Sequence, residues 1–215
     1  MQPMDCKMKT RFGVFEGENA GIRVIALEGL NGVGKSTLAK AYAGRHPDIA
    51  AGYSASDIFL KDDKLKKYTL FEADPVTSAL FYLSANADSC RRLRMNPPVS
   101  RRVLLDRSVW STVAAAYAKD PDILPTLMDV VFSMRRHLVI PDVVVVLKAP
   151  YETCQSRIET KKSGAEFDAD TRLAFSRKYE LYDILKDSGF DVRFLNTDGK
   201  APCEVLSEFE SLDLW

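Results

Sequence analysis

Short apolar runs alternate along this chain with longer stretches in which apolar residues recur every three or four positions. The runs lie at residues 22–27, 50–54, 102–106, 143–147 and 192–195. Most are rich in Val, Ile and Leu with few polar positions, which is typical of strands buried on both faces of a sheet. We therefore predict five parallel strands.

The stretches between these runs have the period of helices. They predict helices at residues 35–44, 75–93, 111–118, 123–138, 150–159, 169–186 and 202–209. Strands and helices in alternation indicate βαβ units, so the predicted fold class is α/β, a three-layer α/β/α sandwich with a five-stranded parallel sheet. The apolar helix at 123–138 suits either a homodimer interface or a core face, and the sequence leaves both open.

Composition narrows the class of protein further. The 215 residues suit one α/β domain at 21–215, preceded by an N-terminal extension at 1–20. Thirty basic residues balance thirty acidic ones and no apolar run could cross a bilayer, so we expect neither a nucleic-acid polymer nor a membrane as partner. The four cysteines are far apart and the N-terminus has no apolar core, which favours reduced thiols and a cytoplasmic location.

A glycine-rich loop follows the first predicted strand and opens the first predicted helix. Residues 29–37 read GLNGVGKST and match the pattern GxxxxGK[ST]. The glycines let several backbone N–H groups face one concavity that suits phosphate oxygens, and the helix directs its positive end at the same point. Lys35 adds a full charge at the terminal phosphates of ATP, and the Ser36 hydroxyl can bind Mg²⁺. The predicted nucleotide-binding residues are Gly29, Asn31, Gly32, Val33, Gly34, Lys35, Ser36 and Thr37.

The third predicted strand ends in a second charged feature, Asp106-Arg107. The carboxyl ends of parallel strands share one edge of the sheet, so this pair should lie beside the glycine loop. Asp106 would then bind Mg²⁺ together with Ser36, and Arg107 would bridge the oxygens of phosphate donor and acceptor. We predict Lys35, Asp106 and Arg107 as catalytic residues, with an ordinary salt-bridged strand end as the alternative for the last two.

A polar segment near residues 157–170 is the candidate for a lid, because it lies between two predicted helices and contains a glycine. Its closure would bring cations onto the transferred phosphate, with Arg157 as a catalytic residue and Lys161 and Lys162 as lid residues. Gly32 has no side chain to offer there, which favours a cation from the lid. A solvated helix face is the alternative explanation of these charges.

Taken together, these motifs resemble those of the thymidylate kinase family. Residues 28–37 (EGLNGVGKST) resemble its EGxDGxGKST loop, residues 80–86 (LFYLSAN) its base-contacting helix, and residues 106–111 (DRSVWS) its DRYxxS motif. The resemblance implies a P-loop NTPase fold of the nucleotide kinase type, with ATP and Mg²⁺ as cofactors. It also implies substrate contacts by Phe81, Leu83, Asn86, Arg107 and Trp110.

The chain departs from the family pattern on the acceptor side. Asn31 stands in place of an Asp, Ala87 in place of the Arg that contacts thymine, Leu83 in place of the stacking Phe, and Ser108 in place of a Tyr. The phosphate-binding residues are intact. A pocket without its usual hydrogen-bond donor should discriminate its base poorly or read another one.

Three functions are consistent with these residues. The first, which we favour, is ATP-dependent phosphoryl transfer to a nucleoside monophosphate, as in the conversion of dTMP and ATP to dTDP and ADP or with a related nucleotide. The second is a deoxynucleoside kinase, since DRSVWS also resembles the ERSxYS motif of that family and a hydroxyl acceptor would need a general base. The third is a degenerate ATP-binding protein with an altered acceptor pocket.

Overall fold

The computed structural model describes residues 19, 21–53, 55, 61–160 and 171–215. Within these residues five strands form one sheet in the order β2-β3-β1-β4-β5, and each neighbouring pair is parallel. The predicted five-stranded parallel sheet is therefore confirmed. Its strands are β1 (Arg23–Glu28), β2 (Ala50–Tyr53), β3 (Arg102–Asp106), β4 (Val143–Lys148) and β5 (Val192–Asn196).

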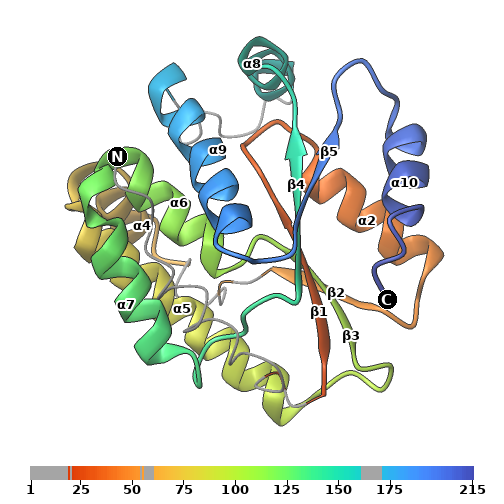
Figure 1. The fold of residues 1–215 in the computed structure, drawn as a ribbon, viewed down its shortest axis with the longest axis horizontal. Helices are drawn as coiled ribbons and strands as arrows, with labels where there is room; N and C mark the ends of the chain where they lie inside the picture. Colours follow the sequence, from red (N-terminus) through yellow and green to blue (C-terminus); the bar gives the residue numbers. More distant parts are fainter. Residues whose placement is uncertain (1–18, 20, 54, 56–60, 161–170) are drawn as a thin grey trace.

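Helices cover both faces of this sheet, which confirms the three predicted layers (Figure 1). One face carries α2 (Lys35–Arg45) and α10 (Pro202–Glu210). The other face carries α5 (Pro75–Met95), α6 (Val109–Lys119), α7 (Leu124–Met134) and α9 (Arg172–Asp187). The helix α8 (Tyr151–Thr160) follows β4 beyond the carboxyl end of that strand.

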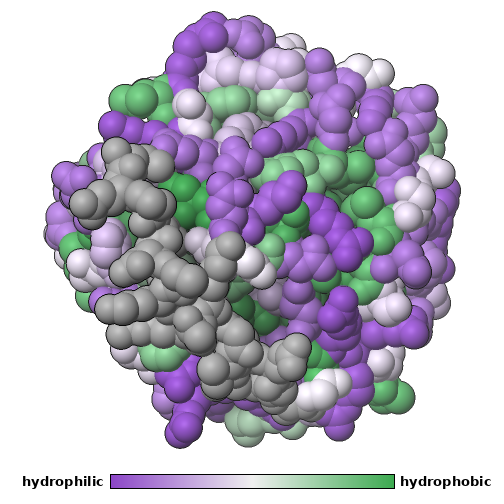
Figure 2. Space-filling view, viewed as in Figure 1, coloured by the Kyte–Doolittle hydropathy of each residue, from purple (hydrophilic) through white to green (hydrophobic). Residues whose placement is uncertain are grey.

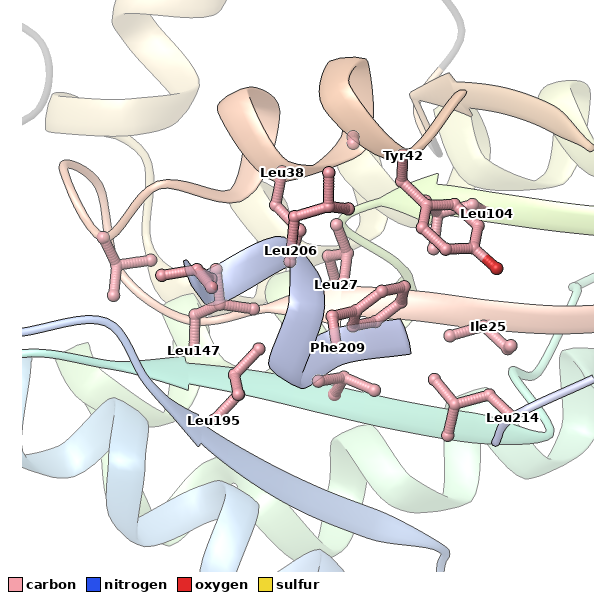
Figure 3. Packing of buried hydrophobic residues seen from close by; sticks show 14 of the residues in the cluster. Ile25, Leu27, Leu38, Tyr42, Leu104, Leu147, Leu195, Leu206, Phe209 and Leu214 are labelled. Atoms are coloured by element: carbon pink, nitrogen blue, oxygen red, sulfur yellow. The ribbon is translucent and has the colours of Figure 1, made fainter. Parts of the chain in front are cut away.

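The strand period of two explains why both faces are apolar. Along β4, Val143, Val145 and Leu147 pack with α2 and α10, whereas Val144 and Val146 pack with the helices of the opposite face. Figure 3 shows the first of these clusters, beneath α2 and α10. Each of these side chains is almost fully buried and contributes roughly 1.5–3 kcal/mol to the stability of the fold.

Two stretches differ from the sequence-based prediction. The helix predicted at 123–138 begins as a 3-10 turn at Pro121–Ile123, and the α-helix proper ends at Met134, where the N–H of His137 donates to the Met134 carbonyl oxygen at 2.7 Å. The apolar side of α7 packs in the core through Leu124, Met128 and Val131, and Leu127 is buried in a smaller cluster beside it. The chain also forms α4 (Asp63–Lys67) and a π-helix, η1 (Tyr68–Glu72), where no helix was predicted.

The exposed residues of the protein are mostly polar, as the many charged residues of the chain lead one to expect. Among the residues that Figure 2 colours by hydropathy, hydrophilic ones predominate and apolar ones lie between them. None of the helices in the described ranges has the length and apolar character needed to cross a membrane. The predicted N-terminal extension at 1–20 lies outside these ranges, apart from Asn19, whose side-chain amide donates to the Ile140 carbonyl oxygen at 2.9 Å.

Candidate active site

The glycine loop connects the end of β1 to the start of α2, as predicted. Gly29 and Gly32 have φ values of 119° and 78°, a left-handed region that side chains disfavour. A Cβ atom at Gly29 would lie 2.5 Å from the Leu147 carbonyl oxygen, and one at Gly32 would lie 3.0 Å from the carbonyl carbon of Cys154. Helix α2 has no side-chain cap at its N-terminus, so its first amide groups are left for a ligand or water.

Lys35 is the first residue of α2, and its ammonium group is buried in the loop. It donates hydrogen bonds to the carbonyl oxygens of Gly29, at 2.8 Å, and Leu30, at 2.7 Å. Burial lowers the pKa of Lys35 well below its ordinary value, and the nearby charge of Arg107 lowers it further. A buried cation in this position gains most from an anionic ligand, because the anion restores the favourable charged form.

Ser36 and Asp106 meet across the gap between α2 and the end of β3. The Ser36 hydroxyl donates to Asp106 Oδ2 at 2.6 Å. The second carboxylate oxygen, Oδ1, is buried and has no hydrogen-bond partner, which is unusual for a buried polar atom. A hydroxyl and an orphaned carboxylate oxygen together are the hard oxygen ligands that suit Mg²⁺.

Arg107 follows Asp106 and turns back over the glycine loop. Its backbone is left-handed, with φ 76°, and its N–H donates to the Leu27 carbonyl oxygen at 2.9 Å. Its guanidinium group donates to the side-chain oxygen of Asn31. A non-glycine residue in this conformation costs about 1–3 kcal/mol and is a feature that often marks functional sites.

Glu28 is one of the site residues that sequence analysis missed, together with Lys66, Lys119, Lys178 and Tyr182 of the cavity described below. It ends β1, has no exposed surface, and accepts hydrogen bonds from the Ser108 N–H at 2.7 Å and the Ser108 hydroxyl at 2.6 Å. The hydroxyl groups of Ser111 and Tyr182 donate to its other oxygen. Burial and this carboxylate together raise the pKa of Tyr182 well above its ordinary value. The sequence does contain a signal for Glu28, because it is a charged residue at the end of an otherwise apolar strand.

A cavity of about 620 Å³ adjoins the glycine loop. Four basic side chains line it, from Lys66, Arg107, Lys119 and Lys178, and no Asp or Glu is among its described lining residues. Lys119 donates to the Leu70 carbonyl oxygen at 2.9 Å and so ties α6 to the π-helix η1. Aromatic and small side chains complete the walls, including those of Phe71, Tyr82, Ala114, Ala115, Ala118 and Tyr182. The cavity therefore suits an anionic molecule that also carries a ring.

The predicted substrate contacts divide in two. Asn86 and Arg107 line the cavity, and so does Tyr82, one helical turn before Asn86. The structure does not bring Phe81, Leu83 or Trp110 to the cavity lining. Leu83 and Trp110 are core residues with 1% and 0% exposure. On α5, Tyr82 and Asn86 lie one turn apart and both line the cavity, whereas Leu83 is rotated by about 100° from Tyr82 and packs in the core.

The cation that was predicted to act from the lid and that lies within the described ranges, Arg157, does not line the cavity. Arg157 lies on α8, where its guanidinium group donates to Thr197 Oγ1 at 3.2 Å and to the Thr197 carbonyl oxygen at 2.8 Å. The Thr197 hydroxyl in turn donates to the Val33 carbonyl oxygen at 3.0 Å, so Arg157 supports the glycine loop from the β5 side. Lys161 and Lys162 lie outside the described residues.

A glycine loop between strand and helix, a buried lysine and a carboxylate on the adjacent strand define the P-loop class of phosphate-binding proteins. The chain belongs to the AAA domain family, whose model matches residues 24–181.

Curated relatives cover most of the chain. A probable thymidylate kinase of Methanospirillum hungatei is 26% identical over 188 residues, which cover 84% of this chain and 88% of the relative. A thymidylate kinase of Mycoplasma pneumoniae is 27% identical over 200 residues, which cover 86% of this chain and 90% of the relative.

Solved structures share the fold. The deoxyadenosine kinase from M. mycoides with bound dATP has a TM-score of 0.66 at 14% identity and covers 88% of this chain and 98% of its own. The thymidylate kinase from Ehrlichia chaffeensis has a TM-score of 0.58 at 18% identity and covers 88% and 97%. The fold is therefore that of P-loop nucleotide kinases, as predicted.

Proposed function

We propose that this protein is an ATP-dependent kinase that transfers a phosphoryl group to a nucleoside monophosphate, in the manner of a thymidylate kinase. The observation that carries the proposal is the cavity beside the glycine loop, which is lined by four basic side chains. A monophosphate acceptor brings about two negative charges, which these cations would stabilise. An uncharged nucleoside brings no negative charge for these side chains to stabilise.

The residues around the loop divide the work of phosphoryl transfer. The loop backbone and Lys35 hold the triphosphate of ATP. Ser36 and Asp106 would hold Mg²⁺, which when bound neutralises charge between the phosphates. Arg107 lies between the loop and the cavity, where a planar guanidinium can contact oxygens of both phosphates. A monophosphate oxygen is already a nucleophile, so positioning and charge neutralisation are sufficient.

The names of the relatives support the same class of acceptor. Both curated relatives described above are named as thymidylate kinases. The deoxyadenosine kinase shares the fold, but a nucleoside hydroxyl acceptor would need a general base. The four basic side chains that line the cavity favour the monophosphate acceptor.

A binding screen tests this proposal. Thermal shifts are measured for each common nucleoside and its monophosphate in the presence of Mg²⁺ and a non-hydrolysable ATP analogue. A monophosphate at a hundred times its Kd should add about 2.7 kcal/mol to the stability. The matching nucleoside at the same concentration should add much less stability, because its Kd is expected to be higher. Equal shifts from the nucleosides would contradict the acceptor class.

A pair of lysine variants locates the binding. Lys178→Met should reduce the shift caused by the monophosphate and retain most of the shift caused by the ATP analogue. Lys40→Met is the matched control, because Lys40 is exposed on α2 and does not line the cavity. Loss of the monophosphate shift in the control, or its retention in Lys178→Met, would place the acceptor elsewhere.

A further inference from the structure

The fully buried carboxylate of Glu28 has no part in the scheme above. It accepts four hydrogen bonds, two on each oxygen, from the beginning of α6 and from Tyr182 on α9. Each oxygen is therefore saturated by protein donors. A carboxylate in this state cannot readily take up a proton from a substrate, so its contribution has to come from what it holds in place.

Glu28 holds the backbone on one side of Arg107. The Ser108 N–H, in the peptide group after Arg107, donates to Glu28 Oε1 at 2.7 Å. The Arg107 N–H, in the peptide group before it, donates to the Leu27 carbonyl oxygen at 2.9 Å. Both peptide groups around Arg107 are thus bonded to the last two residues of β1, and this fixes both backbone angles of a residue in the left-handed region.

We propose that Glu28 is a positioning residue that acts through Arg107. Its carboxylate keeps the turn after β3 in the conformation that places the guanidinium group on Asn31, at the mouth of the acceptor cavity. A carboxylate suits this role because all four groups around it are donors. A glutamine would direct its N–H groups at some of them, and the turn could then relax. The effect on catalysis rests on the proposed function, whereas the effect on the conformation of Arg107 does not.

A double-mutant cycle measures whether Glu28 acts through Arg107. Glu28→Gln should lower kcat with the monophosphate acceptor by about 10²-fold, which is the typical effect of a catalytic group misplaced by an ångström. Arg107→Ala should have at least as large an effect. The double variant should be no slower than Arg107→Ala alone, since the carboxylate has nothing left to position. Effects that multiply in the double variant would show a role independent of Arg107 and would overturn the proposal.

Two further variants guard against simple loss of folding. Glu210→Gln is the matched control, because Glu210 also joins two elements, through Arg45 and His46, but is remote from the cavity. Its effect should be small and should multiply with that of Arg107→Ala. If Glu28→Gln does not fold, Ser111→Ala removes one donor and keeps the carboxylate. It should lower kcat by about tenfold and should again have no effect beyond that of Arg107→Ala.

A crystal structure of Glu28→Gln, or of Ser111→Ala in its place, tests whether Glu28 sets the conformation of Arg107. This test needs no activity assay. Arg107 should leave the left-handed region, or its guanidinium group should leave Asn31. A variant in which φ remains near 76° and the contact with Asn31 persists would overturn the proposal. If the wild-type enzyme phosphorylated no monophosphate, the proposed function would fail, and this structure would still decide the role of Glu28.

Discussion

Replacement of Gly32 by Ala places one methyl group where the glycine loop packs on α8. The new Cβ atom would lie 3.0 Å from the carbonyl carbon of Cys154 and 3.1 Å from its Cα atom, and nearer still to the carbonyl oxygen. Carbon atoms in ordinary contact are about 3.5–4.0 Å apart. The loop and α8 therefore have to separate by a distance on the order of 1 Å, and every phosphate-binding amide on the loop moves with it.

Two costs add in this variant. The backbone of residue 32 has φ 78°, which costs a non-glycine residue about 1–2 kcal/mol, and the steric conflict adds about 1–3 kcal/mol more. A chain of this length loses about 2–4 °C in Tm for each kcal/mol. We therefore expect Tm to fall by roughly 4–20 °C and turnover of ATP to fall by about 10²-fold.

Two other glycines separate these costs. Gly34 has φ 107° with no atom near its Cβ position, so Gly34→Ala measures backbone strain alone and should lower Tm by about 2–8 °C. Gly44 lies in α2 with neither strain nor a neighbour, so Gly44→Ala should raise Tm by about 1–4 °C. Differential scanning fluorimetry and a coupled ADP-release assay measure both quantities. A Gly32→Ala protein with the Tm and turnover of the wild type would refute the packing of the loop on Cys154.

Three further predictions concern the metal site, Lys35 and the cysteines. Asp106→Asn should raise the Mg²⁺ concentration for half-maximal rate by about 10–100-fold, in a titration against the wild type, because the buried carboxylate oxygen is lost. ATP binding should take up protons at alkaline pH and weaken as pH rises, because the pKa of Lys35 is lowered in the free protein and phosphate favours its charged form. Calorimetry in two buffers of different ionisation enthalpy measures this proton uptake. Equal binding heats in the two buffers would contradict the prediction. Burial raises the pKa of Cys90 to about 11, so iodoacetamide at pH 8 should label the exposed Cys203 long before Cys90. The same shift means that the stability contributed by Cys90 is complete below pH 9, its ordinary pKa, and is lost as pH rises toward 11.

Local signals in the sequence are sufficient for the sheet and the phosphate side of the site. The strand at 102–106 has the predicted ends, because charged residues bound a short apolar run. The glycine loop, Lys35 and Ser36 lie where the motif places them, since the motif is a short continuous stretch between β1 and α2. Asp106 joins them because parallel strands end at one edge.

The acceptor side depends on contacts between distant segments, which no local pattern records. Glu28 meets Tyr182 across more than 150 residues of sequence, and Lys178 reaches the cavity from α9. Leu83 was predicted at the substrate because the resemblance fixes the helix but not its rotation. The π-helix η1 was missed because its residues have no regular apolar period and α4 before it has no buried residue.

The identity of the labelled product tests the central claim most directly. The protein is incubated with Mg²⁺, ATP labelled at the γ-phosphate and a panel of nucleosides and nucleoside monophosphates, with Lys35→Ala as the inactive control. Our account predicts that the label enters a nucleoside diphosphate and that Lys35→Ala transfers none. Label found in a nucleoside monophosphate, or only in inorganic phosphate whatever acceptor is present, would contradict it.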